Sequence, residues 1–139
     1  MIDCVILSYA RTRDLYRMTQ TAINSLVGDF DGATIYVGGG NYIRDNNSLT
    51  TIDQSALTSV GGYNYINDNN SLTTIDQSSL ASVGEDNYIY SNNSLTTIDQ
   101  TSLASVGGYN YIYSNNPLTT IIEAPTLTFT NLNNSNQIS

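Results

Sequence analysis

Tyrosine recurs in this chain at a spacing of 23 residues. One column consists of Tyr42, Tyr65, Tyr88 and Tyr111, and a second, two residues further on, consists of Arg44, Asn67, Tyr90 and Tyr113. Because alternate residues of a strand share a face, both columns are expected on one surface as an aromatic strip. Such rings bind a protein, a glycan or a second copy of the chain through large contact areas at small entropic cost. Lateral ring stacking that only stabilises the sheet is the alternative role.

Aspartate forms a further column, which consists of Asp53, Asp76 and Asp99. Convergent carboxylates can bind calcium, which prefers oxygen ligands. Each aspartate also begins an Asp-Gln-Ser or Asp-Gln-Thr segment, where a carboxylate accepts hydrogen bonds from the N–H groups of a turn. We favour this capping role, and we expect neither a metal site nor a cofactor.

Two asparagine columns accompany the tyrosines. The first, Asn41, Asn64, Asn87 and Asn110, has the strand parity of the isoleucines two residues later and is expected to point inward as an amide ladder. The alternative places these amides outward, where they would bind a ligand. The second, Asn46, Asn69, Asn92 and Asn115, is expected to bond the backbone of a turn.

Other residue types argue against two further activities. Adjacent threonines, such as Thr50 and Thr51, recur in every unit. Solenoidal ice-binding proteins need one residue between two outward threonines, whereas adjacent ones point to different sides unless the chain bends.

The chain has no histidine and no lysine, and Cys4, the one cysteine, lies in an apolar run. No serine or cysteine is accompanied by a base, so we expect no enzyme activity.

A tandem repeat must position these columns. The segment NNSLTTIDQSALTSVGGYNYI aligns with NNSLTTIDQSSLASVGEDNYI and NNSLTTIDQTSLASVGGYNYI at shifts of 23 residues. The apolar columns begin at Leu49, Ile52, Leu57, Val37 and Ile43. A single unit cannot bury these residues, but stacked units make a continuous core. We therefore predict a β-rich solenoid with about 23 residues per coil and roughly 3.5 coils.

The order of residues within a unit adds a family resemblance. VGGYNYIYSNNPLTTI, residues 106–121, resembles the receptor L domain type of leucine-rich repeat, and the resemblance covers about residues 37–122. It implies a leucine-rich-repeat-like coil. Asn41 and its equivalents stand where that family has the first leucine of the strand.

The first 37 residues follow the repeat poorly and predict a β-α-β cap. Residues 2–9 have the apolar character of a buried strand, residues 13–26 have amphipathic helical spacing, and residues 34–37 suggest a second strand. This segment resembles the opening of phage-like GT-A glycosyltransferases. The resemblance implies a nucleotide site at Ser8, Tyr9 and Ala10, and a truncated, inactive transferase as an alternative identity.

The charge composition limits the classes of partner that the chain can bind. Twelve acids face four basic residues, giving a net charge of −8, which disfavours nucleic acid and anionic membrane. The short apolar start has neither the length of a membrane span nor the charge of a signal peptide, so we expect a cytoplasmic or viral protein.

These observations predict one folding unit: a head at residues 1–37, a solenoid at 38–123, and a C-terminal strand and tail at 124–139. The expected function is that of a non-enzymatic module that binds a protein or glycan, or associates with itself. A remnant transferase and a chain without selected function are the alternatives.

Overall fold

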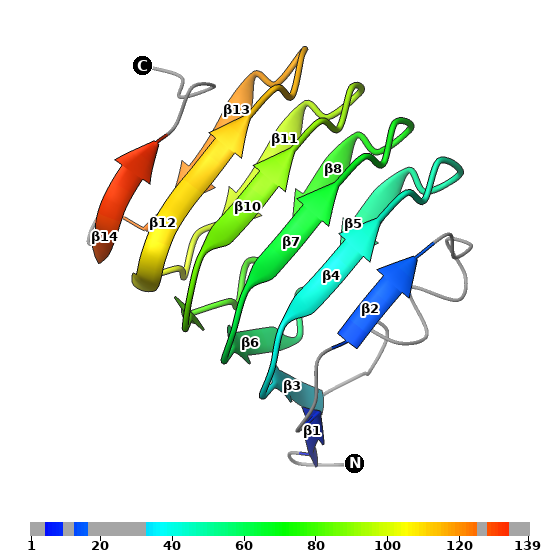
Figure 1. Ribbon diagram of the computed structural model, residues 1–139. Coiled ribbons are helices and arrows are strands. Elements are labelled where there is room, and N and C mark those ends of the chain that lie inside the picture. The colour runs from blue at the N-terminus through cyan, green and yellow to red at the C-terminus, as the bar shows by residue number, and fades with distance from the viewer. Residues whose placement is uncertain (1–4, 10–12, 17–32, 125–127, 134–139) are drawn as a thin grey trace.

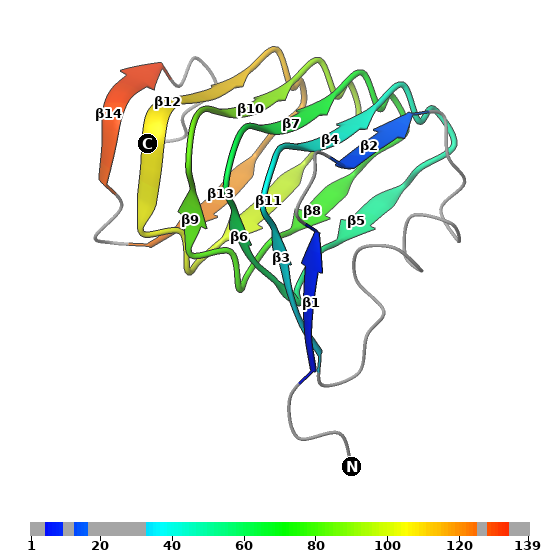
Figure 2. The ribbon, with the colours of Figure 1, turned by 60° about the horizontal axis from the view of Figure 1, so that its bottom comes forward.

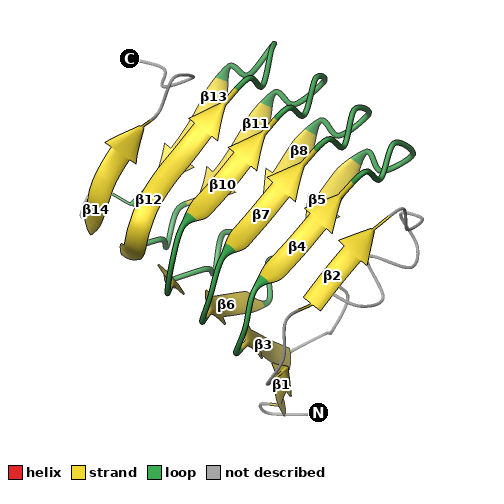
Figure 3. Cartoon of the chain, viewed as in Figure 1, coloured by secondary structure: helices red, strands yellow, loops and turns green. Residues whose placement is uncertain are grey.

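The computed structural model describes the backbone of residues 5–9, 13–16, 33–124 and 128–133, and the side chains of residues 37–124 (Figure 1). These parts of the chain form strands and turns, with no helix among them (Figure 3). No helix able to cross a bilayer occurs within these ranges. The strands wind into a solenoid, which confirms the predicted architecture and its spacing of 23 residues.

Each coil contributes strands to three sides of the solenoid (Figure 2). The first side contains β2 (Arg13–Tyr16), β4 (Asn41–Arg44), β7 (Asn64–Asn67), β10 (Asn87–Tyr90) and the end of β12 (Ser105–Tyr113). The second contains β5 (Thr51–Asp53), β8 (Thr74–Asp76), β11 (Thr97–Gln100) and β13 (Thr120–Glu123). The third contains β1 (Val5–Tyr9), β3 (Ala33–Val37), β6 (Leu57–Val60), β9 (Ser82–Val83) and the start of β12.

Parallel pairing holds equivalent residues in register. Asn41 pairs with Asn64, Tyr42 with Tyr65 and Ile43 with Ile66, and the pattern continues through β10 and β12. The second side forms a four-stranded sheet of its own, whereas β12 turns the corner and joins the first and third sides into one ten-stranded sheet. Identical side chains therefore lie above one another at the spacing of strands.

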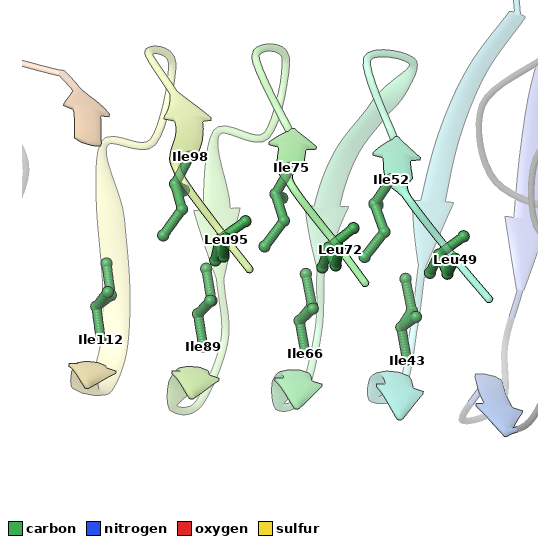
Figure 4. Close-up of a cluster of buried hydrophobic side chains, with 10 residues drawn as sticks. All are labelled: Ile43, Leu49, Ile52, Ile66, Leu72, Ile75, Ile89, Leu95, Ile98 and Ile112. Atoms are coloured by element: carbon green, nitrogen blue, oxygen red, sulfur yellow. The ribbon is translucent and has the colours of Figure 1, made fainter. Parts of the chain in front are cut away.

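Apolar columns fill the interior in two clusters. The larger cluster stacks isoleucines and leucines between the first and second sides (Figure 4); it contains Ile43, Leu49, Ile52, Ile66, Leu72, Ile75, Ile89, Leu95, Ile98 and Ile112. The smaller lies against the third side and contains Val37, Leu57, Val60, Leu80, Val83, Leu103 and Val106. Each fully buried side chain of this size stabilises the fold by about 1.5–3 kcal/mol, so stacking provides what one coil cannot.

One glycine column permits the close approach of successive coils. A Cβ added to Gly84 would overlap the carbonyl oxygen of Gly61, and one added to Gly107 would overlap that of Gly84. Backbone atoms of this kind cannot move aside without opening the coil. The glycines at this corner thus serve contact between coils as well as turning.

The head differs from its predicted form. Residues 13–16, expected to begin a helix, form strand β2, and residues 17–26 lie outside the described residues. Leu15 pairs with Ile43 and Tyr9 with Val37, so β2 and β1 extend the same ten-stranded sheet. Pairing with the edge of β4 satisfies backbone groups that a helix would satisfy internally, and this tertiary contact overrides local helical periodicity.

At the other end, β14 (Thr128–Asn133) runs parallel to β12 (Figure 1). The C-terminal strand that the sequence predicts within residues 124–139 is therefore present, at residues 128–133. β14 is itself a member of the ten-stranded sheet and covers the edge that β12 would otherwise expose.

Candidate binding face

Tyrosines gather on the outer surface of the first side. We call this surface the tyrosine face and define it by Tyr42, Tyr63, Tyr65, Tyr88, Tyr90, Tyr109, Tyr111 and Tyr113. It follows from alternation in β4, β7, β10 and β12: the asparagines and isoleucines are buried, and the tyrosines between them are not.

The central column is a continuous ring stack. Ring centroids lie 5.2 Å apart for Tyr42 and Tyr65, 4.5 Å for Tyr65 and Tyr88, and 4.7 Å for Tyr88 and Tyr111, with interplanar angles of 11–17°. These distances match the strand spacing of about 4.8 Å and fall in the range that aromatic pairs prefer. The flat faces of the inner rings are therefore in contact with each other.

Further rings surround this column. Tyr90 and Tyr113 stack at 5.0 Å and meet Tyr88 and Tyr111 edge-on at 6.4 Å. Arg44, predicted in the same column, is exposed, and its register neighbour Asn67 is buried.

The sequence interpretation missed Tyr63 and Tyr109, which are 37% and 40% exposed. The ring centroids of Tyr63 and Tyr65 lie 5.7 Å apart, and those of Tyr109 and Tyr111 lie 4.9 Å apart. Their position two residues before those tyrosines was the available signal, since it places them on the same face. The column was obscured because its members differ between coils.

Two carboxylates interrupt the tyrosine face in the third repeat. The Glu85 carboxylate interacts with the Tyr63 hydroxyl and raises the pKa of that phenol. The Asp86 Oδ1 atom accepts a hydrogen bond from the backbone N–H of Tyr109 at 2.6 Å. Burial, followed by the charge of Asp86, raises the pKa of Tyr88. The outer surface is thus aromatic and negatively charged.

Beneath this face runs a buried column of amides. Asn41 Nδ2 donates to Asn64 Oδ1 at 2.9 Å, Asn64 Nδ2 to Asn87 Oδ1 at 2.7 Å, and Asn87 Nδ2 to Asn110 Oδ1 at 2.8 Å. All of these asparagines are buried, which confirms the inward ladder over the outward, ligand-binding alternative. Hydrogen bonding within the column offsets the cost of burying its amides.

A second buried ladder, made of glutamines, was not predicted from the sequence. Gln77 Nε2 donates to Gln54 Oε1 at 2.6 Å, and Gln100 Nε2 donates to Gln77 Oε1 at 2.8 Å. Asn64 and Gln77 also exchange hydrogen bonds at 3.3 and 3.4 Å, joining the two ladders across the interior. Gln54 stands two residues after the buried Ile52, so alternation along the strand indicated its inward direction.

The second asparagine column bonds the turns as predicted. Asn69 Nδ2 donates to the carbonyl oxygen of Ile43 at 3.0 Å, and Asn69 Oδ1 accepts from the N–H of Asn46 at 3.0 Å. The turn residues before these asparagines, such as Asp45 and Asp68, have a φ of 56°. The buried amide holds a turn whose backbone lies in the left-handed region.

The aspartate column caps turns, as predicted. Asp53, Asp76 and Asp99 each accept a hydrogen bond through Oδ1 from the N–H two residues later, at 3.0–3.1 Å. In the parts of the chain that the structure describes, no three histidines, cysteines or acids are grouped to hold a metal.

The threonine pairs lie at a bend, between buried Leu49 and buried Ile52 in the first of the repeats. Neither Thr50 nor Thr51 is buried, so the bend turns both outward and the expected opposite orientation does not hold there. Thr73 Oγ1 donates to the Thr50 carbonyl oxygen at 2.9 Å, a contact between coils.

Comparisons with known proteins gave no match: no family model, no curated protein and no solved structure matches this chain. Of the residues that the transferase resemblance singled out, Ser8 and Tyr9 belong to β1, whereas Ala10 lies outside the described residues.

Proposed function

We propose that this chain is a non-enzymatic repeat protein that binds another protein through the tyrosine face. The observation that carries the proposal is the continuous stack of Tyr42, Tyr65, Tyr88 and Tyr111 on an outer sheet surface. The rings are held in one arrangement by their strands, so a partner meets a surface that loses little entropy on binding.

Ring geometry favours a protein partner over a glycan. Sugars stack on the flat face of an aromatic ring. The ring centroids of Tyr65 and Tyr88 lie 4.5 Å apart, so the facing sides of these two rings are in contact with each other and leave no room for a sugar. What these rings present outward is edges and hydroxyl groups. Such groups suit the mixed apolar and hydrogen-bonding contacts of a polypeptide.

The dimensions favour a short segment. Three strand spacings and about five residues along each strand give roughly 14 by 16 Å, or about 230 Å². A stable protein pair buries about 800 Å² on each partner. The tyrosine face is thus suited to an extended peptide, and a second copy of the chain is the weaker candidate.

A peptide array tests the proposal. Wild-type protein is applied to immobilised peptides beside the Tyr65→Ser/Tyr88→Ser variant and the control Thr74→Ser/Thr97→Ser, whose changes lie on the four-stranded sheet. We expect a set of peptides bound by the wild type and the control but lost by the tyrosine variant, with sedimentation showing monomers.

Folding is checked by circular dichroism, and Tyr65→Phe/Tyr88→Phe keeps the stack if the serine variant unfolds. Retention of the same peptides by a folded serine variant contradicts the proposal. So does the absence of any bound peptide. If the serine variant unfolds, full binding by the phenylalanine variant contradicts a role for the tyrosine hydroxyl groups in binding the peptide.

A further inference from the structure

The third repeat departs from the others on the tyrosine face. Its Glu85 and Asp86 occupy the positions of Gly62 and Tyr63 one coil earlier and of Gly108 and Tyr109 one coil later. The rest of the unit is nearly unchanged. The departure therefore adds two carboxylates to a surface that is otherwise aromatic.

Three tyrosines surround these carboxylates. Glu85 raises the pKa of the Tyr63 phenol, Asp86 adds to the effect of burial in raising that of Tyr88, and the N–H of Tyr109 donates to Asp86 Oδ1 at 2.6 Å. Each carboxylate can accept about four hydrogen bonds, and each phenol oxygen can accept as well as donate. The group is thus rich in acceptors, and the backbone N–H of Tyr109 holds the Asp86 carboxylate in place.

The tyrosine face as a whole carries more acidic than basic residues. At the opposite end of the same strands, Asp45 and Asp68 lie in the turns that follow β4 and β7, and Arg44 is the one basic residue on this side among residues 37–124. The charge of Asp86 also contributes to raising the pKa of Tyr63, Tyr65, Tyr88 and Tyr111, so its field extends along the stack. A surface of this sign attracts cations and repels a second copy of a chain with net charge −8.

We propose that the tyrosine face takes a cationic peptide segment, with arginine side chains of the partner bound at Glu85 and Asp86. This inference rests on the proposed function and specifies the partner's chemistry. A planar guanidinium carries five N–H donors, which match paired carboxylate and phenol oxygens. The backbone of the segment lies along the ring edges of the stack.

An NMR titration of isotope-labelled protein at low ionic strength tests whether the tyrosine face binds a cationic peptide. The probe is a synthetic peptide of alternating arginine and serine, and its control has citrulline, a neutral analogue of the same shape, in place of arginine. We expect amide shifts at Tyr63, Tyr65, Tyr88 and Tyr109 with the arginine peptide only. Because exposed ion pairs are weak and screened, the affinity falls steeply with added salt.

Matched variants locate the charge. Glu85→Gly/Asp86→Tyr gives the third repeat the residues of its neighbours, and Asp76→Asn/Asp99→Asn removes the same number of charges from the four-stranded sheet. We expect the first to lower the affinity for the arginine peptide about tenfold and the second to leave it within about twofold. Glu85→Gln/Asp86→Asn is used if the first variant melts at a lower temperature.

Each result has a defined meaning. Equal binding of the two peptides, equal weakening by both pairs of variants, or shifts confined to another side overturns the inference. If array peptides bind and depend on Tyr65 and Tyr88 but not on Glu85 and Asp86, the proposed function stands and only this inference fails. If no peptide binds the tyrosine face in either experiment, both fail.

Discussion

Glu123 on β13 lies in register with Gln100 on β11, at the end of a buried glutamine column. In that column each later glutamine donates an amide hydrogen bond to the earlier one. Ionised Glu123 has no proton to donate to Gln100 Oε1, and among residues 37–124 its Oε1 atom receives one long contact, of 3.5 Å from Asn110 Nδ2. The last coil therefore ends the ladder with a half-buried acid.

We expect Glu123→Gln to stabilise the protein at neutral pH. Burial raises the pKa of Glu123 above its ordinary value of 4.5, although the Asn110 hydrogen bond opposes this. The folded state therefore favours the protonated acid, and this stabilisation is complete below the unfolded pKa and is lost as pH rises through the folded pKa. The substituted amide completes the ladder at every pH and adds about 0.5–1.5 kcal/mol at pH near 7.

Urea unfolding at several pH values between about 4 and 8 measures this effect. The variant should lose the part of the pH dependence that comes from Glu123. Asp99→Asn, on the outer surface of the adjacent strand, is the control for removal of an acid. Identical pH profiles for wild type and Glu123→Gln would show that residue 123 does not belong to the buried ladder.

A second prediction separates buried from exposed asparagine ladders. Asn64 joins Asn41, Asn87 and Gln77 through hydrogen bonds of 2.7–3.4 Å. Asn64→Leu leaves those buried amides without their partner, and each unmade hydrogen bond costs about 1–3 kcal/mol. We expect a loss of at least about 2 kcal/mol in the free energy of unfolding, measured by urea denaturation.

The control carries the same substitution on the surface. Asn70 Nδ2 donates to Asn47 Oδ1 at 3.0 Å, and both side chains are exposed. Water replaces that hydrogen bond, so Asn70→Leu should cost less than about 1 kcal/mol. Equal losses in the two variants would refute a special role for the buried ladder.

Strand alternation accounts for what the sequence predicted correctly. The spacing of two between Asn64 and Ile66 placed both inside and Tyr65 outside, because a strand has only two faces. The same rule applied to Ile52 and Gln54 predicts the glutamine ladder, but the Asp-Gln-Ser segment that begins at Asp53 also predicts a turn. The inward direction of Gln54 was therefore available in the sequence and was missed.

Other features depend on contacts that no local pattern contains. Residues 13–16 fit a helical period, yet they pair with the edge of β4, which local propensity does not encode. Ring stacking between Tyr65 and Tyr88 depends on rotamers set across two coils. The group formed by Glu85 and Tyr63 likewise joins residues of different coils, in a column whose members vary.

The third prediction concerns alkaline unfolding. Burial is the leading cause that raises the pKa of Tyr65, Tyr88, Tyr90 and Tyr111 above the ordinary value of 10.0. The folded state therefore favours neutral phenols, and the stability they contribute is present below pH about 10 and is lost as pH rises through the raised values. Tyr88→Phe keeps a ring in the stack but cannot ionise, so it should unfold at a higher pH than the wild type. Circular dichroism and phenolate absorbance, followed together from pH about 9 to 12, measure the transition, and equal stability at pH near 7 shows that the stack is intact. Coincident alkaline transitions in the two proteins would mean that ionisation of Tyr88 does not open the tyrosine face.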